Sequence, residues 1–341
     1  MIAYYVHHHG SGHAHRAAAI AAHATTSVVG LSSAPVPPGW RGRWIRLPGD
    51  SEGVVDPWAA DVTAAGTLHW APRQHAGLRS RMARIGDVLA GGKVRLVVTD
   101  VSVEVSLLAR LYGVPVVVMA QPGQRLDRAH RLAYDLAERL LAPWPRQPEP
   151  GWPRSWCAKT VHVGAISRYD GRRTPEPTAG RRVVALWGSG GLDIGPDDLV
   201  AAAGATPRWT WDVVGPPEPV RAGVANLRWC GWLEAVWPML CAADVVVTHA
   251  GQSALAEVAA ARRPAVVVPQ DRPHGEQRAT ADALVRAAIG VVVPTWPQRH
   301  EWPALLDEAA RQGGNAWSRW SPGDGATRAA AVLDELATAT G

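Results

Sequence analysis

The stretch DVVVTHAGQSALAEVAAARRPAVVVPQDRPHGEQ, residues 244–277, indicates the fold class of this chain. It contains a valine run, a turn with glycine, an alanine-rich segment, a second valine run after a proline, and a polar loop. Continuous apolar runs of this length are typical of strands buried on both faces of a parallel sheet. We therefore predict strands at 244–248 and 265–268, joined by a helix over 253–261.

The same alternation continues on both sides of this stretch. In the second half we predict strands at 183–187 and 209–214 and helices at about 276–288 and 326–336. In the first half, strands at 2–6, 96–99, 114–119 and 161–163 alternate with helices at 14–24, 103–112 and 127–141. This pattern predicts an α/β protein with two doubly wound, Rossmann-like domains whose strands end at a central cleft.

A polar segment separates the two halves. Residues 167–182 are rich in proline, glycine and arginine, which is typical of an interdomain linker. We therefore expect an N-terminal domain over 1–166 and a C-terminal domain over 183–341, a division that suits a chain of 341 residues.

Composition favours a cytoplasmic enzyme. The three cysteines form no CxxC pair, which fits a reducing compartment and argues against a structural zinc site. We see no signal peptide and no apolar run near the roughly 18 residues that a membrane-spanning helix needs. Residues 1–178 carry 21 Lys and Arg against 13 Asp and Glu, whereas residues 179–341 carry 14 against 17. The basic half indicates either a solvated surface or an anionic partner, such as a membrane surface or a lipid-linked acceptor, and no feature predicts nucleic-acid binding.

Each half opens with a strand followed by a glycine-rich turn. The turns are HGSGH at 9–13 and GSGG at 188–191, and neither matches a Walker or GxGxxG motif. Glycines allow a backbone to approach a ligand closely, and N–H groups at a helix start attract anions. Two such turns predict a phosphate-bearing ligand, although a plain tight turn explains each one alone.

The order of elements in residues 244–277 resembles the donor half of GT-B glycosyltransferases. It is most similar to the branch of the N-acetylglucosaminyltransferase that builds the lipid-linked peptidoglycan precursor. The resemblance covers the C-terminal half and, in the N-terminal half, mainly the turn with His13. It implies a GT-B fold, a nucleotide diphosphate-sugar donor, expected to be a UDP-sugar, and inverting hexosyl transfer to an unidentified acceptor hydroxyl without a cofactor.

The resemblance also implies roles for particular residues. Glu257 corresponds to the glutamate that binds both ribose hydroxyls, with an exposed helix charge as the alternative. The other implied donor contacts are Gly251, Gln252 and Ser253 at the diphosphate; Gly12, Ser189 and Gly190 near the phosphates; Trp232 and Leu233 at the base; and Glu276 and Gln277 at the sugar. His249 lies where the plant branch has a diphosphate-binding histidine and the peptidoglycan branch has arginine. A core role explains Trp232 equally well.

His13 is the candidate general base. It follows the first strand at the start of a helix, and an imidazole can accept a proton from a hydroxyl at neutral pH. Asp100 ends the strand at 96–99 and could orient His13, as an equivalent aspartate does in the plant branch. A helix N-cap is the alternative role of Asp100.

Two further hypotheses concern metals and other activities. Consecutive histidines 7–9 alternate in direction along a strand, no carboxylate or cysteine lies nearby, and Asp-x-Asp is absent, so we expect no metal site.

A nucleotide-sugar 2-epimerase on the same fold would need several acidic groups, for which the first half offers Asp100 and Glu104. A non-catalytic nucleotide-sugar binder is the second alternative, and His13 argues weakly against it.

Overall fold

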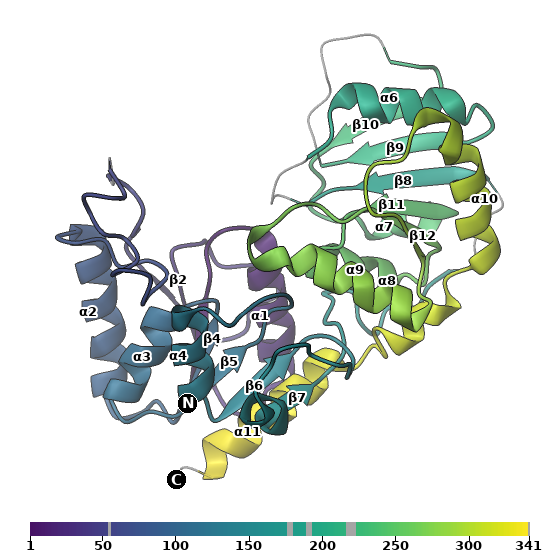
Figure 1. The fold of residues 1–341 in the computed structure, drawn as a ribbon. Coiled ribbons are helices and arrows are strands. Elements are labelled where there is room, and N and C mark those ends of the chain that lie inside the picture. Colours follow the sequence, from purple (N-terminus) through teal and green to yellow (C-terminus); the bar gives the residue numbers. More distant parts are fainter. Residues whose placement is uncertain (54–55, 176–179, 189–192, 216–222, 340–341) are drawn as a thin grey trace. The chain divides into compact units, whose positions relative to one another are not determined.

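The computed structural model describes residues 1–341 except 54–55, 176–179, 189–192, 216–222 and 340–341 (Figure 1). The chain divides into two compact α/β units. Unit 1 comprises Met1–Val163 and Gly325–Gly341, and unit 2 comprises Gly164–Asp324. Each unit has its own parallel sheet, so the prediction of two doubly wound domains is confirmed.

Unit 1 contains a seven-stranded sheet in the order β3-β2-β1-β4-β5-β6-β7. Its strands are β1 (Ile2–Val6), β2 (Val28–Ser32), β3 (Arg43–Arg46), β4 (Leu96–Asp100), β5 (Val116–Met119), β6 (Arg139–Ala142) and β7 (Thr160–His162). β1 pairs in parallel with both β2 and β4, and Val6 lies opposite Asp100. The strand order therefore reverses between β1 and β4, which is where open α/β sheets bind ligands.

The helices of unit 1 are α1 (Ser11–His23), α2 (Ala76–Ala90), α3 (Val103–Leu111), α4 (Arg128–Leu136), α5 (Arg154–Lys159) and α11 (Gly325–Ala339). α1 starts after Gly10, whose φ of 78° is one that residues with side chains rarely adopt. This glycine lets the chain turn directly from β1 into α1.

Unit 2 contains a six-stranded parallel sheet in the order β10-β9-β8-β11-β12-β13. Its strands are β8 (Arg182–Leu186), β9 (Thr210–Val214), β10 (Leu227–Gly231), β11 (Val245–Thr248), β12 (Ala265–Val267) and β13 (Val291–Val292). This is the strand order of the dinucleotide-binding Rossmann fold. Its switch point lies between β8 and β11, where the stretch at 244–277 begins.

The helices of unit 2 are α6 (Pro196–Ala205), α7 (Trp237–Ala242), α8 (Gln252–Ala260), α9 (Glu276–Ala287) and α10 (Trp302–Gln312), with 3₁₀ turns η1 (Pro273–Gly275), η2 (Arg299–Glu301) and η3 (Asn315–Arg319). Leu199 of α6 and Trp302 of α10 belong to one buried cluster with Trp211 and Val247 of the sheet. Large indole rings thus fill the core of a chain that has 17 tryptophans and no phenylalanine.

The structure differs from the expectations in three places. The helix predicted at 127–141 ends at Leu136, and residues 139–142 form β6, because their apolar side chains are buried between β5 and β7. The expected linker at 167–182 starts inside unit 2, where the Tyr169 hydroxyl accepts a hydrogen bond from the Val236 N–H. The last helix, α11, belongs to unit 1 and not to the expected domain 183–341.

Asp334 explains part of the placement of α11. Its carboxylate accepts hydrogen bonds from the N–H groups of Thr25 and Thr26 and from the Thr25 hydroxyl. α11 also packs against α1. The chain therefore leaves unit 1 after β7 and returns to it at its end.

Across the described segments, no helix is both long and apolar enough to cross a membrane.

Candidate functional site

The first candidate site lies at the switch point of unit 1. His13 is on the first turn of α1, just after β1, and Asp100 is the last residue of β4. His13 Nδ1 lies 2.9 Å from Asp100 Oδ1. The Asp100 side chain is fully buried, whereas 24% of the His13 side chain is exposed. The carboxylate is thus a fixed partner of a ring that solvent can reach.

Arg16 completes this group and was not predicted from the sequence. Its Nε donates to Asp100 Oδ2 at 3.1 Å, and its Nη2 donates to Oδ1 at 2.6 Å. Arg16 follows His13 by one helical turn, so the i, i+3 spacing was the available signal. Burial by itself would raise the pKa of Asp100, but Arg16 and His13 hold it well below its usual range.

The charge on Asp100 determines the tautomer that we assign to His13. Nδ1 faces a carboxylate oxygen, and a lone pair on Nδ1 would repel that oxygen at 2.9 Å. Nδ1 also lies 3.1 Å from Arg16 Nη2, a donor that would favour the opposite tautomer. We assign the proton to Nδ1 because its contact with Asp100 is the shorter of the two, and this assignment leaves the lone pair on Nε2. This arrangement lets His13 accept a proton through Nε2. The alternative role of Asp100 as an N-cap is wrong, because Ser102 caps α3.

The second candidate site lies at the switch point of unit 2. α8 begins after Gly251, and its first N–H groups follow β11 directly. His249 Nδ1 accepts the N–H of Gly251 at 3.0 Å, and its Nε2 lies 3.3 Å from the Gly188 nitrogen. The ring therefore connects the turn after β8 with the start of α8. Burial, followed by the charge of Arg272, lowers the pKa of His249 to about 4, so the ring is neutral at pH 7.

Glu257 is on α8 and has a defined partner. Arg168 Nε donates to Glu257 Oε1 at 2.8 Å, and Arg168 Nη1 donates to the Glu234 carbonyl. Only 12% of the Glu257 side chain is exposed, so the alternative of an exposed helix charge is wrong. Burial raises the pKa of Glu257, and Arg168 opposes this shift.

The remaining predicted donor contacts fall into four groups. Gln277 is buried, and its Oε1 accepts the N–H groups of Ala250 and Gln270, so this side chain shapes the loop after β11. Trp232 and Leu233 follow β10 and are 61% and 37% exposed, so Trp232 is not a core residue. Ser189 and Gly190 lie outside the described residues. Gly12 and Gln252 are near the starts of α1 and α8, Ser253 is on α8, and Glu276 is the first residue of α9.

One group of potential metal ligands occurs in the described ranges, and it does not include histidines 7–9. His69, Asp127 and His130 place three ligand atoms within 4.8 Å of one another. Arg125 Nη1 lies 3.3 Å from His130 Nε2, which makes Nε2 the hydrogen-bond acceptor and leaves the proton on Nδ1. This Nδ1 lies 2.6 Å from Asp127 Oδ2. A protonated Nδ1 cannot bind a metal, so the donor set fits a hydrogen-bonded group better than a metal site.

The chain is similar in sequence to known glycosyltransferases. Residues 225–301 match the model of the glycosyltransferase family 28 C-terminal domain. A UDP-N-acetylglucosamine–N-acetylmuramyl-(pentapeptide) pyrophosphoryl-undecaprenol N-acetylglucosamine transferase from Sorangium cellulosum is 31% identical over 262 residues, which cover 69% of this chain and 62% of the relative. A relative of the same name from Bifidobacterium longum is 31% identical over 144 residues, which cover 40% of this chain and 35% of the relative. The chain thus spans about a third of the length of that relative.

A solved structure resembles the chain as a whole. The glycosyltransferase of kitacinnamycin has a TM-score of 0.69 at 17% identity, and the match covers 98% of both chains. At this level of identity the likeness concerns the fold.

Proposed function

We propose a function on the premise that this chain has the GT-B fold and resembles the N-acetylglucosaminyltransferases of the peptidoglycan precursor. It transfers a hexosyl group from a nucleotide diphosphate-sugar, namely a UDP-sugar, to an acceptor hydroxyl. The observation that carries this proposal is the arrangement at α8. A glycine-started helix at the switch point presents N–H groups, and the same helix carries the half-buried Glu257.

The donor would bind to unit 2 through these groups. N–H groups at a helix start favour the negative charge of a diphosphate. A carboxylate accepts hydrogen bonds from two neighbouring hydroxyls, such as those of a ribose. Arg168 donates to Glu257 Oε1, and its positive charge opposes the rise of the Glu257 pKa that burial causes. Glu257 is therefore the proposed ribose ligand and Arg168 its positioning residue.

The acceptor would be activated by unit 1. The hydroxyl oxygen attacks the anomeric carbon, its proton moves to His13 Nε2, and the bond from the anomeric carbon to the diphosphate breaks. Asp100 stabilises the imidazolium that forms, as the aspartate of a catalytic triad does. Because the hydroxyl displaces the diphosphate in a single step, the proposed reaction inverts the anomeric centre. The leaving diphosphate would be stabilised by helix N–H groups, so the proposal needs no metal.

An epimerase is less well supported. Both oxygens of Glu104 are engaged, since Oε1 accepts the N–H groups of His69 and Trp70 and Oε2 accepts the Ser102 hydroxyl. Asp100 is bound to Arg16 and His13. Neither acid is thus available to move protons on a sugar. Release of UDP only when an acceptor is present supports transfer, whereas conversion of the donor sugar without an acceptor supports epimerisation.

The proposal is tested by UDP binding to the full chain. UDP at 100 times its Kd is expected to raise the free energy of unfolding by about 2.7 kcal/mol. Glu257→Ala is expected to weaken UDP binding about tenfold or more, because the charged acceptor for the ribose is lost. Asp282→Ala is the matched control, an exposed acidic residue on α9. Calorimetric titration measures both affinities.

Two results would contradict the proposal. Unchanged UDP affinity in Glu257→Ala would remove Glu257 from the donor site. Loss of UDP binding and of transfer in EDTA, restored by Mg²⁺, would show that a metal holds the diphosphate. We expect both to persist in EDTA.

A further inference from the structure

We propose that the acceptor is a compact hydroxyl compound of about two fused rings, uncharged or cationic, that binds in a pocket of unit 1. An anionic, diphosphate-bearing lipid does not fit this pocket. The inference rests on the proposed function, because it names the molecule that receives the sugar.

The pocket lies at the carboxyl ends of β1 and β4. It has a volume of about 300 Å³, and its lining includes His7 and His8 after β1, Glu104 on α3, and Asp50, Trp70 and Met82. A protein cavity of about 150 Å³ holds one benzene ring, so this volume suits roughly two fused rings. The Trp70 and Met82 side chains supply apolar surface for such rings.

The pocket lies beside the proposed base. His7 lines it, and the His7 and His13 ring centroids are 5.5 Å apart in an edge-to-face contact. Both residues belong to the segment that connects β1 with the first turn of α1. A hydroxyl at the rim of the pocket next to His7 is therefore close to the imidazole that would accept its proton.

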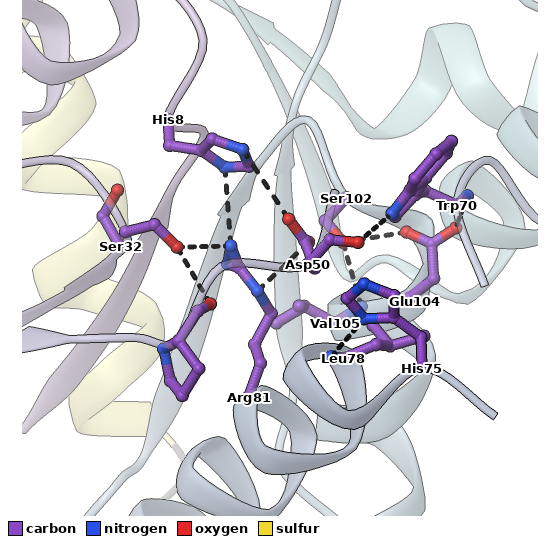
Figure 2. Close-up of polar contacts among 12 residues, drawn as sticks. His8, Ser32, Asp50, Trp70, His75, Leu78, Arg81, Ser102, Glu104 and Val105 are labelled. Carbon is purple, nitrogen blue, oxygen red and sulfur yellow. Dashed lines mark hydrogen bonds and ion pairs between the residues drawn. The ribbon is translucent and has the colours of Figure 1, made fainter. Parts of the chain in front are cut away.

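An ion pair between Arg81 and Asp50 lies beside the pocket. Figure 2 shows Arg81 of α2 between His8 and Asp50. The Arg81 side chain is fully buried, its Nε lies 3.1 Å from Asp50 Oδ2, and its Nη2 donates to Ser33 Oγ. Arg81 is not part of the lining, whereas Asp50 is. The guanidinium thus serves the fold and leaves a carboxylate facing the pocket.

Asp50 retains an oxygen for a ligand. Its Oδ1 lies 3.6 Å from His8 Nε2, which is longer than a hydrogen bond. This oxygen can accept a hydrogen bond from a hydroxyl or ammonium group of an acceptor. A phosphate or carboxylate group would instead meet an acceptor oxygen that has no proton to donate to it.

Three further ionisable groups of the lining, Glu104, His7 and His8, also favour a neutral or cationic ligand. Glu104 adds a second carboxylate, held by the N–H group of His69 and by that of Trp70, which Figure 2 shows. Burial, and then the neighbouring His13, lowers the pKa of His7 to about 3, and burial also lowers the pKa of His8. These two rings are neutral at pH 7, and among the described lining residues there is no lysine or arginine. A diphosphate in this pocket would meet carboxylates and none of the lysine or arginine side chains that commonly bind its oxygens.

The test compares three ligands of matched size by calorimetric titration of the full chain at pH 7.5. They are 2-naphthol, its cationic analogue 6-(aminomethyl)-2-naphthol and its anionic analogue 6-hydroxy-2-naphthoate. We expect the neutral and cationic compounds to bind, and the anion to bind at least tenfold more weakly. We also expect farnesyl diphosphate, an anionic lipid probe, not to displace 2-naphthol.

A charge variant separates electrostatics from shape. Glu104→Gln keeps an oxygen for the two backbone N–H groups and an amide that can donate to the Ser102 hydroxyl, so the local structure is preserved. It should raise the affinity for 6-hydroxy-2-naphthoate on the order of tenfold and leave that for 2-naphthol unchanged. Asp87→Asn, an exposed site on α2, is the matched control and should change neither.

Each of these binding experiments has a result that would contradict the inference. Equal affinities for naphthol and naphthoate, displacement of naphthol by farnesyl diphosphate, or no binding of any naphthol by a chain that binds UDP would overturn the inference. Failure to bind UDP would instead overturn the proposed function, since UDP is assigned to unit 2. The naphthol titrations do not depend on UDP, so the two failures are distinguishable.

Discussion

At the residue scale, the chemistry proposed for unit 1 depends on the free Nε2 of His13. His13→Ala is expected to lower turnover by about 10²–10⁴-fold, the usual contribution of a positioned proton acceptor. UDP affinity should be unchanged, because the donor contacts other than Gly12 are assigned to unit 2. Asp100→Asn should lose less activity, since the base is still present but its tautomer and orientation are no longer held.

Three measurements on His13→Ala distinguish the possible roles of the ring. Weaker UDP binding would indicate a phosphate contact, and a lower melting temperature with normal turnover per folded molecule would indicate packing. His23→Ala, an exposed histidine at the end of the same helix, is the control. Turnover near that of the control would exclude His13 as the base.

At the element scale, the start of α8 depends on contact between a glycine and a histidine. A Cβ atom at Gly251 would lie 2.3 Å from Cε1 of His249, so alanine must displace the ring that contacts Gly188. We expect Gly251→Ala to lower the free energy of unfolding by about 1–3 kcal/mol and to weaken UDP binding. Chemical denaturation and UDP titration measure the two effects.

Gly204→Ala on α6 is the matched control for this prediction. A Cβ atom at Gly204 meets only Val224 Cγ1, at 3.6 Å, which is ordinary contact. Alanine favours a helix over glycine, so this variant should stabilise the protein by about 0.5–1 kcal/mol. If the two variants changed stability equally, the close approach of His249 to α8 would not be a determinant of the fold.

At the scale of the whole molecule, buried histidines make stability depend on pH. The pKa values of His7 and His130 in unit 1 are lowered to about 3, and that of His249 in unit 2 to about 4, in each case mainly by burial. These groups are neutral when folded and bind a proton near pH 6.5 when unfolded. Their contribution is therefore fully present above pH 6.5 and is lost as the pH falls toward 3–4.

Urea denaturation at pH 7.5 and 5.0 measures this loss. The expected change approaches 1.4 kcal/mol per pH unit for each histidine at pH values below 6.5. His7→Asn should reduce the pH dependence of unit 1, because one proton-binding group is removed. An identical pH dependence in this variant and the parent would contradict the assignment of His7 as a buried neutral ring.

Local pattern in the sequence was sufficient for much of the architecture. Strands and helices depend on residues only a few positions apart, and the spacing of apolar residues detects them. This holds for the valine runs at 245–248 and 265–267, for the glycine before α8 and for the apolar strands of the first half. The positions of His13 and Glu257 follow from the same local order, because each lies a fixed distance beyond a predicted strand. Local pattern failed where a short apolar run fits either element, as at 139–142.

Tertiary structure alone decided which distant residues meet. His13 and Asp100 are 87 residues apart, and they lie together because β1 pairs with β4. Arg81 of α2 binds Asp50 in the loop after β3, and α11 returns to unit 1 through Asp334 and the backbone at Thr25. The sequence determined the elements and their order, since these depend on local geometry and burial. The charge of the pocket and the partners of Asp100 and Glu257 depend on packing between segments far apart in the chain, which local pattern does not encode.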